Sequence, residues 1–99
     1  MNDGFVQALR VGVEHPALPG HFPGAPLVPG VLLLEQVALA LRAWRGQRLG
    51  CVLEAKFAAP LQPDETAQLQ LTMADASRVR FEIRRDGMVL ARGLVEGAA

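Results

Sequence analysis

The segment that most restricts the fold is residues 29–45, PGVLLLEQVALALRAWR, which has the signals of a helix and is apolar on almost every side. Proline is well tolerated near a helix start, and Gly46 is typical of the position that ends a helix. Arg42 and Arg45 lie close to the negative end of the helix dipole. The apolar residues between these signals are Val31, Leu32, Leu33, Leu34, Val37, Ala38, Leu39, Ala40, Leu41, Ala43 and Trp44. A helix of this kind is buried, so the rest of the chain is expected to wrap it.

Several stretches have the pattern of β-strands. Residues 66–73 and 78–84 alternate apolar and polar side chains with a period of two, which is typical of strands with one buried face. Asp86-Gly87 then predicts a two-residue hairpin turn. The expected strands are residues 5–13, 49–58, 66–73, 78–84 and 88–95. The predicted fold class is therefore α+β, a single domain over residues 1–99 in which an antiparallel sheet wraps around one central buried helix.

The composition argues against several classes of protein. With 99 residues, of which 51% are apolar, the chain can bury a core without a metal or a disulfide. Ten basic and ten acidic residues cancel, so nothing in the net charge calls for nucleic acid or an anionic membrane. Cys51 is the only cysteine, and the N-terminus shows no signal-peptide pattern. We therefore expect a cytoplasmic protein without a nucleic-acid or membrane partner. The two histidines and one cysteine lack the spacing of zinc ligands, so no metal is expected.

A proline-rich loop precedes the predicted helix. Residues 14–30 hold five prolines and three glycines around His21, and are expected to form an ordered loop. Glu35 lies in the leucine-rich helix that follows, where burial of an unpaired carboxylate would be unfavourable. Each residue alone has a structural interpretation, because Glu35 can face a solvated edge and His21 can belong to an inert tight loop. Together they predict an acid–base site.

The chemistry of such a site follows from its groups. Imidazole titrates near ~6.5 and can take or return a proton at working pH. An apolar pocket favours the protonated carboxyl group, which makes Glu35 a candidate general acid. The N–H groups at the helix start can stabilise negative charge on a carbonyl oxygen, and Gly30 lets that oxygen approach the backbone closely.

The stretch HFPGAPLVPGVLLLE resembles the hot-dog-fold 3-hydroxyacyl-[acyl-carrier-protein] dehydratases, whose signature is H-F-P-G-x-P-x-x-P-G followed by a helical Glu or Asp. Glu35 falls at the family's spacing of fourteen residues after His21. Downstream, KFAAPLQPDE resembles the family's K-F-x-x-P-x-x-P-x-D segment. The positions that match the signature are His21, Phe22, Pro23, Gly24, Pro26, Pro29 and Gly30.

The resemblance implies dehydration of a 3-hydroxyacyl thioester, carried on the phosphopantetheine of acyl carrier protein, to the trans-2-enoyl thioester. By this analogy His21 takes the α-proton, Glu35 helps protonate the departing hydroxyl, and the Gly30 amide holds the thioester oxygen. The loop that shapes the site would contain Phe22, Pro23, Gly24 and Pro29. The family builds its site across a dimer and needs no cofactor, so a homodimer or higher even oligomer, or a hetero-oligomer, is expected. The pathway is fatty-acid synthesis or, as in similar short chains, aryl-polyene or polyketide-like synthesis.

Two departures from the family pattern leave alternatives open. Leu39 stands where the family often has glutamine, and an N-terminal helix and strand usual in the family are expected to be missing. One alternative is a hot-dog thioesterase, although thioesterases of this fold generally lack the histidine loop. The other is a catalytically silent hot-dog subunit that pairs with an active partner.

The remaining residues of interest have weaker signals. Cys51 is expected to be a small buried side chain, Trp44 to pack in the core or an interface, and His15 lies outside the motif. A set of arginines could form a basic surface for an acidic carrier protein, or could be the solvated face of a strand. These are Arg78, Arg80, Arg84, Arg85 and Arg92.

Overall fold

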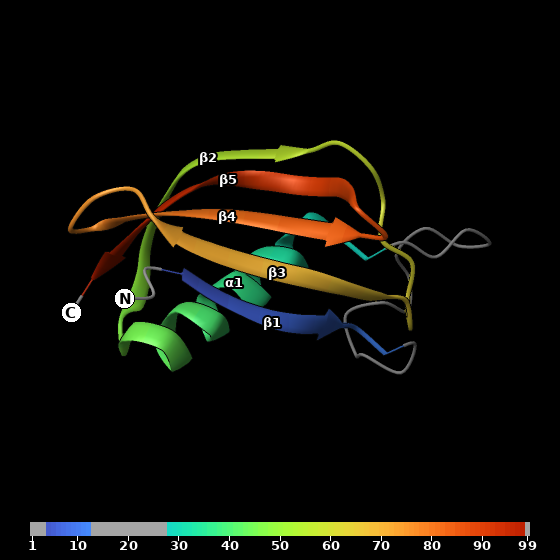
Figure 1. Cartoon of the computed structure of the whole chain (residues 1–99), viewed down its shortest axis with the longest axis horizontal. Helices are drawn as coiled ribbons and strands as arrows, with labels where there is room; N and C mark the ends of the chain where they lie inside the picture. The colour runs from blue at the N-terminus through green and yellow to red at the C-terminus, as the bar shows by residue number, and fades with distance from the viewer. Residues whose placement is uncertain (1–3, 13–27, 99) are drawn as a thin grey trace.

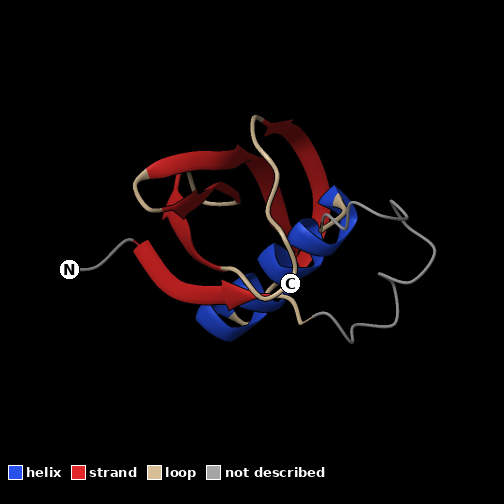
Figure 2. Cartoon of the chain, turned by 90° about the vertical axis from the view of Figure 1, so that its right-hand side faces the viewer, coloured by secondary structure: helices blue, strands red, loops and turns tan. Residues whose placement is uncertain are grey.

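A computed structural model describes residues 4–12 and 28–98 of the chain. One antiparallel five-stranded sheet, in the order β1-β3-β4-β5-β2, curls around a single helix (Figures 1 and 2). The elements are β1 (Gly4–Arg10), α1 (Gly30–Arg45), β2 (Arg48–Phe57), β3 (Thr66–Met73), β4 (Arg78–Arg85) and β5 (Met88–Ala98). The predicted α+β architecture is confirmed.

Local sequence signals account for most of the element boundaries. The alternating residues of β3 and β4 place every second side chain in the core. Asp86 and Gly87 have positive φ angles of 52° and 82°, as a type I′ hairpin turn requires. Gly46 ends α1 in the left-handed conformation, and its N–H donates to the Arg42 carbonyl. The predicted strand over 5–13 is too long, because β1 ends at Arg10.

The core lies between α1 and the inner face of the sheet. The helix contributes Leu32, Leu33, Val37, Ala40 and Leu41, and all five are buried. At the far end of the helix, Trp44 stacks on Phe5 of β1 with ring centroids 6.2 Å apart. No polar or charged side chain is buried among the residues that the structure describes. No desolvation cost of a buried charge therefore opposes the hydrophobic burial that stabilises the described part of the fold.

The helix is not buried on all sides, so that prediction is wrong. Val31 is 69% exposed, Leu39 is 54% exposed, and Glu35 between them is exposed as well. These residues follow one another at i, i+4 and i+8 and form a stripe along α1. The sheet covers only one side of the helix cylinder, and the stripe lies on the side that it leaves open.

Strand β2 lies at one edge of the sheet, and among the described strands it pairs with β5 alone. Most of its residues are exposed, including Val52, Leu53 and Phe57. Cys51 is exposed too, so its predicted burial is wrong: it lies on an edge strand with no described strand beyond it. A register shift between Val52 and Glu54 bends the strand. A ten-residue edge of this kind has unpaired backbone groups available for another strand.

Candidate functional site

The start of α1 carries the first part of the candidate site. Pro29 precedes the helix in an extended conformation, with φ of −61° and ψ of 147°, and no side chain caps this end. Its carbonyl accepts hydrogen bonds from the N–H groups of Leu32 (3.0 Å) and Leu33 (3.4 Å). The first N–H groups of a helix, here those of Gly30 and Val31, have no acceptor within the helix. They are therefore suited to polarise a carbonyl oxygen.

Phe57 at the end of β2 covers Gly30. A Cβ atom built on Gly30 would lie 3.0 Å from Phe57 Cζ and 3.2 Å from Cε1 and Cε2, closer than ordinary van der Waals contact. The ring therefore requires a glycine, or a small displacement, at this point of the helix. Phe57 was not predicted as a site residue, although it belongs to the KFAAPLQPDE segment that resembles the family.

An apolar pocket of about 370 Å³ adjoins the same helix end. Phe57, Leu33 and Val28 line it together with the chain that leaves β2. The remaining lining residues are Gly30, Ala58, Ala59, Pro60 and Leu61. The hydrogen bond from the Val28 N–H to the Leu61 carbonyl, 2.8 Å long, ties the two walls together. None of the lining residues is charged, so this pocket suits an apolar part of a ligand.

Glu35 lies on a different side of α1 from this pocket. At about 100° per residue, Glu35 is rotated by about 140° from Gly30 and about 160° from Leu33. Its exposed carboxylate has no hydrogen bond or ion pair with any residue that the structure describes. Within one chain the structure therefore does not bring Glu35 and the helix N-terminus to a common pocket.

The second part of the predicted site is the loop around His21, which the structure does not describe. His21, Phe22, Pro23 and Gly24 lie outside the described residues, as does His15. Among residues 4–12 and 28–98, no group of three or more His, Cys, Asp or Glu side chains is arranged to hold a metal ion. The helix α1, with 16 residues, is not a candidate membrane span, and no other helix occurs in the described part of the chain.

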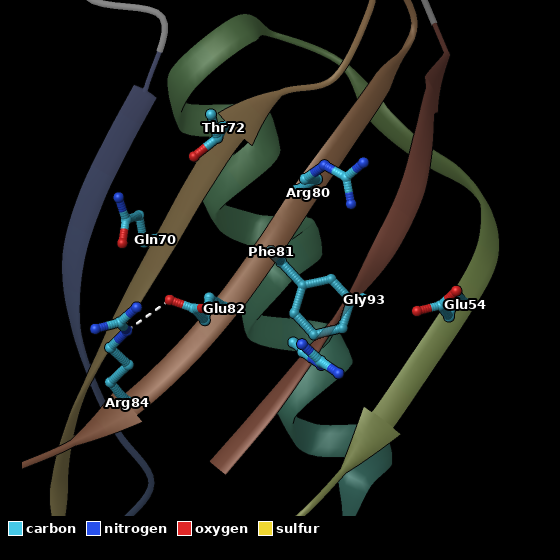
Figure 3. A pocket seen from close by; sticks show the side chains of 9 residues that line it. Glu54, Gln70, Thr72, Arg80, Phe81, Glu82, Arg84 and Gly93 are labelled. Atoms are coloured by element: carbon cyan, nitrogen blue, oxygen red, sulfur yellow. Dashed lines mark hydrogen bonds and ion pairs between the residues drawn. The ribbon is translucent and has the colours of Figure 1, made fainter. Parts of the chain in front are cut away.

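A second depression, of about 460 Å³, lies on the face of the sheet that points away from α1 (Figure 3). It is polar: Arg80, Glu82 and Arg84 of β4 line it beside Gln70 and Thr72 of β3. The Glu82 carboxylate accepts a hydrogen bond of 2.5 Å from Arg84 Nε. Glu54, Arg92, Gly93 and the nearly buried Phe81 also line the depression. None of the predicted acid–base residues contributes to this depression.

Two carboxyl groups elsewhere have shifted pKa values with structural causes. The Gln62 N–H donates to Glu65, and together with Arg85 it lowers the pKa of that carboxyl. The N–H groups of Ser77 and Arg78 lower the pKa of Asp75. Both groups stabilise loops at the surface.

Comparison with known proteins identifies the family. Residues 2–94 match the ApeI-like family, described as the ApeI dehydratase. The 3-hydroxyacyl-[acyl-carrier-protein] dehydratase FabZ of Klebsiella pneumoniae is 32% identical over 94% of this chain and 66% of its own length. FabZ of Chlamydia trachomatis is 37% identical over 62% of this chain and 47% of its own. The chain thus spans about half to two thirds of the length of these curated relatives.

Solved structures agree on the fold. The dehydratase heterocomplex ApeI:P from Xenorhabdus doucetiae superposes with a TM-score of 0.85 at 23% identity, covering 98% of this chain and 88% of that one. A 1,4-dihydroxy-2-naphthoyl-CoA thioesterase from Synechocystis superposes less well, with a TM-score of 0.66 at 19% identity over 96% of this chain and 80% of that one. The chain has the hot-dog fold, and it belongs to the ApeI-like dehydratase family.

Proposed function

We propose that this chain dehydrates a 3-hydroxyacyl thioester on acyl carrier protein to the trans-2-enoyl thioester. The observation that carries the proposal is the helix α1 of a chain in a dehydratase family: it begins at Gly30 with N–H groups that have no acceptor within the helix, and it carries Glu35 five residues later. The motif from His21 to Gly30 supplies the remaining chemistry.

The reaction needs a base, an acid and a group that stabilises negative charge. In this proposal His21 takes the α-proton, and the electron pair of that C–H bond forms the new double bond. The C–O bond to the β-hydroxyl breaks, and Glu35 gives its proton to the departing oxygen, which leaves as water. The Gly30 N–H and the helix dipole stabilise the charge that develops on the thioester oxygen. The substrate brings its own phosphopantetheine, and no step is assigned to a metal or an organic cofactor.

The proposed site is completed by a second hot-dog subunit. Glu35 and the Gly30 pocket lie on different sides of α1, so each needs groups that the described residues of this chain do not place beside it. The exposed edge of β2 can pair with another strand, and Leu53 and Phe57 on it are about half exposed. We infer a second copy of the chain as the partner. The ApeI:P dehydratase of Xenorhabdus doucetiae is a heterocomplex, which supports a different hot-dog chain as the alternative partner.

Two alternative functions are retained because specific observations favour them. Thioesterases share the fold, as the Synechocystis enzyme shows, and Glu35 could direct a water at the same thioester. A catalytically silent subunit is consistent with the separation of Glu35 from the pocket. The proposed pathway is fatty-acid synthesis, or aryl-polyene or polyketide-like synthesis, since the chain matches the ApeI-like family and is similar to FabZ. A cytoplasmic location, predicted from the single cysteine, completes the proposal.

The test uses purified protein with a short 3-hydroxyacyl thioester, once on a carrier protein and once on pantetheine. Loss of one water, detected by mass spectrometry, is the expected result. His21→Ala and Glu35→Gln should each lower the rate by roughly 10²–10⁴-fold. Glu96→Gln is the matched control, because Glu96 of β5 pairs with Cys51, six residues along β2 from Phe57, and should keep full activity. Release of free acid would instead support the thioesterase, and no turnover by a folded protein would support the silent subunit.

A further inference from the structure

The segment that follows β2 belongs to the KFAAPLQPDE motif, to which the proposed reaction assigns no role. Its residues Ala58, Ala59, Pro60 and Leu61 form one wall of the apolar pocket beside Gly30. They lie between β2 and β3 and have no regular secondary structure. The position of this wall therefore depends on individual hydrogen bonds and not on a strand ladder.

Backbone hydrogen bonds hold the two ends of the wall. The N–H groups of residues 58 and 59 donate to the Leu90 carbonyl of β5, over 2.8 Å and 3.1 Å. At the other end, the Leu61 carbonyl accepts a hydrogen bond of 2.8 Å from the Val28 N–H. Pro60 lies between these bonds and has no N–H group to donate. Its carbonyl is therefore the backbone group by which the middle of the wall can be held.

Arg85, at the end of β4, supplies a donor for that carbonyl. Arg85 Nη1 lies 3.1 Å from the Pro60 carbonyl oxygen and 2.8 Å from Glu65 Oε1. Glu65 in turn accepts a hydrogen bond of 2.8 Å from the Gln62 N–H. One guanidinium group thus joins the middle of the wall to the turn that follows it. We call Arg85 and Glu65 the wall pair.

The wall pair is better shielded from water than the Arg78–Asp75 pair at the start of β4. The side chain of Arg85 is 24% exposed and that of Glu65 is 34% exposed, whereas the values for Arg78 and Asp75 are 52% and 50%. Water and salt weaken exposed ion pairs, so most of them contribute little to stability. Charge-assisted hydrogen bonds are stronger than neutral ones, and the wall pair makes them where screening is reduced.

The pocket suits the acyl chain of the substrate better than its pantetheine arm. The arm carries amide groups that need hydrogen-bond partners when they are buried, whereas an acyl chain needs none. The lining of the pocket is uncharged and mostly apolar. The wall pair contacts Pro60 and Gln62, so it acts on the shape of this pocket and not on the reacting groups.

We propose that Arg85 and Glu65 are positioning residues that hold the pocket wall in place and so set the preference of this protein for acyl chain length. This inference rests on the proposed function, because it assigns the apolar pocket to the acyl chain of the thioester substrate. Loss of either side chain frees the Pro60 carbonyl or the turn behind it, and the displaced wall then covers less of the chain.

The test compares kcat/KM for the 3-hydroxybutyryl and 3-hydroxyhexanoyl thioesters of pantetheine. Each CH2 group that the pocket covers should raise kcat/KM by roughly fourfold, so the wild type should prefer the hexanoyl substrate by about tenfold or more. Arg85→Gln and Glu65→Ala should each reduce this preference to about threefold or less. Arg78→Gln is the matched control, because it makes the same substitution on the same strand and breaks the pair with Asp75. This control should keep the preference of the wild type within about twofold.

The outcomes separate positioning from stability. A role in stability alone would lower the melting temperature of the variants and leave the chain-length preference unchanged, and this result would overturn the proposal. A wild type without preference for the longer chain would overturn it too. The double variant Arg85→Gln/Glu65→Ala should lose no more preference than either single variant, because both act through one contact. Losses that multiply in the double variant would contradict this shared contact.

A binding measurement keeps the inference independent of turnover. If the wild type turns over neither substrate, the proposed function fails, and calorimetry with the S-butyl and S-hexyl thioethers of pantetheine tests the pocket instead. The wild type should bind the hexyl thioether about tenfold more tightly, and Arg85→Gln should reduce this difference to about threefold. Equal affinity of the wild type for both thioethers would overturn the inference. Thermal melting verifies that each variant is folded, and Glu65→Ala carries the same prediction if Arg85→Gln does not fold.

Discussion

Substitution of Gly30 by alanine tests the helix N-terminus of the proposed site. The added methyl group would lie 3.0 Å from Phe57 Cζ, a few tenths of an ångström closer than usual. Phe57 is 48% exposed, so its ring can move outward at little loss of packing. Alanine is also favoured over glycine in a helix by about 0.5–1 kcal/mol. The two effects oppose each other, and we expect the free energy of unfolding to change by less than about 1 kcal/mol.

The activity of the Gly30→Ala variant should respond far more strongly than its stability. The methyl group occupies the space through which a thioester oxygen would reach the backbone N–H. Loss of one such donor typically lowers kcat by about 10²–10³-fold, and we expect a loss of at least tenfold here. The assay is the rate of water loss from a pantetheine thioester, measured beside urea unfolding of the same sample.

A second variant separates two effects of the methyl group added at Gly30: its contact with the Phe57 ring and its obstruction of the substrate. Phe57→Ala should destabilise the protein by about 2 kcal/mol, roughly half the value for a core phenylalanine because half of the ring is exposed. In this background Gly30→Ala should become stabilising, while the loss of activity that it causes should persist. Full activity of Gly30→Ala would refute the role of the Gly30 N–H. Destabilisation above about 3 kcal/mol would refute the inference that the ring yields.

Three further predictions concern assembly, packing and pH. Leu53→Lys should leave the fold intact and shift the protein from dimer to monomer in size-exclusion chromatography; an unchanged elution volume would place the interface elsewhere. Gly93→Ala should lower stability by roughly 3 kcal/mol or more in urea unfolding, because its Cβ would overlap the Phe81 ring and the β2 backbone; a wild-type midpoint would contradict this. The lowered pKa values of Glu65 and Asp75 contribute stability that is present above their usual values of 4.5 and 3.8 and is lost as pH falls through the lower folded values. Glu65→Gln should therefore lower the melting temperature at pH 7 but hardly at pH ~2, and an equal effect at both would argue against the linkage.

The local pattern predicted the elements well because each boundary depends on nearby residues. The period of 66–73, the Asp86-Gly87 turn and the Gly46 cap are all short-range signals, and the structure confirms each of them. Exposure depends instead on which elements lie alongside. The sequence alone predicts that Cys51 is buried in a strand. It is exposed because the strand order places β2 at an edge of the sheet.

Only part of the candidate site could be predicted, because sequence signals show which residues lie near one another along the chain but not which distant residues come together. The positions of Gly30 and Glu35 on one helix followed from the sequence, and their placement on different sides of it follows from helical geometry. The contact between Phe57 and Gly30 joins residues 27 positions apart, and only the folded chain brings them together. The pairing of His21 with Glu35 stays a prediction, since His21 lies outside the described residues.

Gly30 and Glu35 lie on different sides of α1, and this has a consequence for the proposed dimer. In that assembly one helix contributes to two active sites, with the N–H groups of its first turn in one site and the Glu35 carboxylate in the other. Dilution below the dissociation constant of the dimer would therefore inactivate both active sites. The catalytic rate per chain would then depend on the protein concentration.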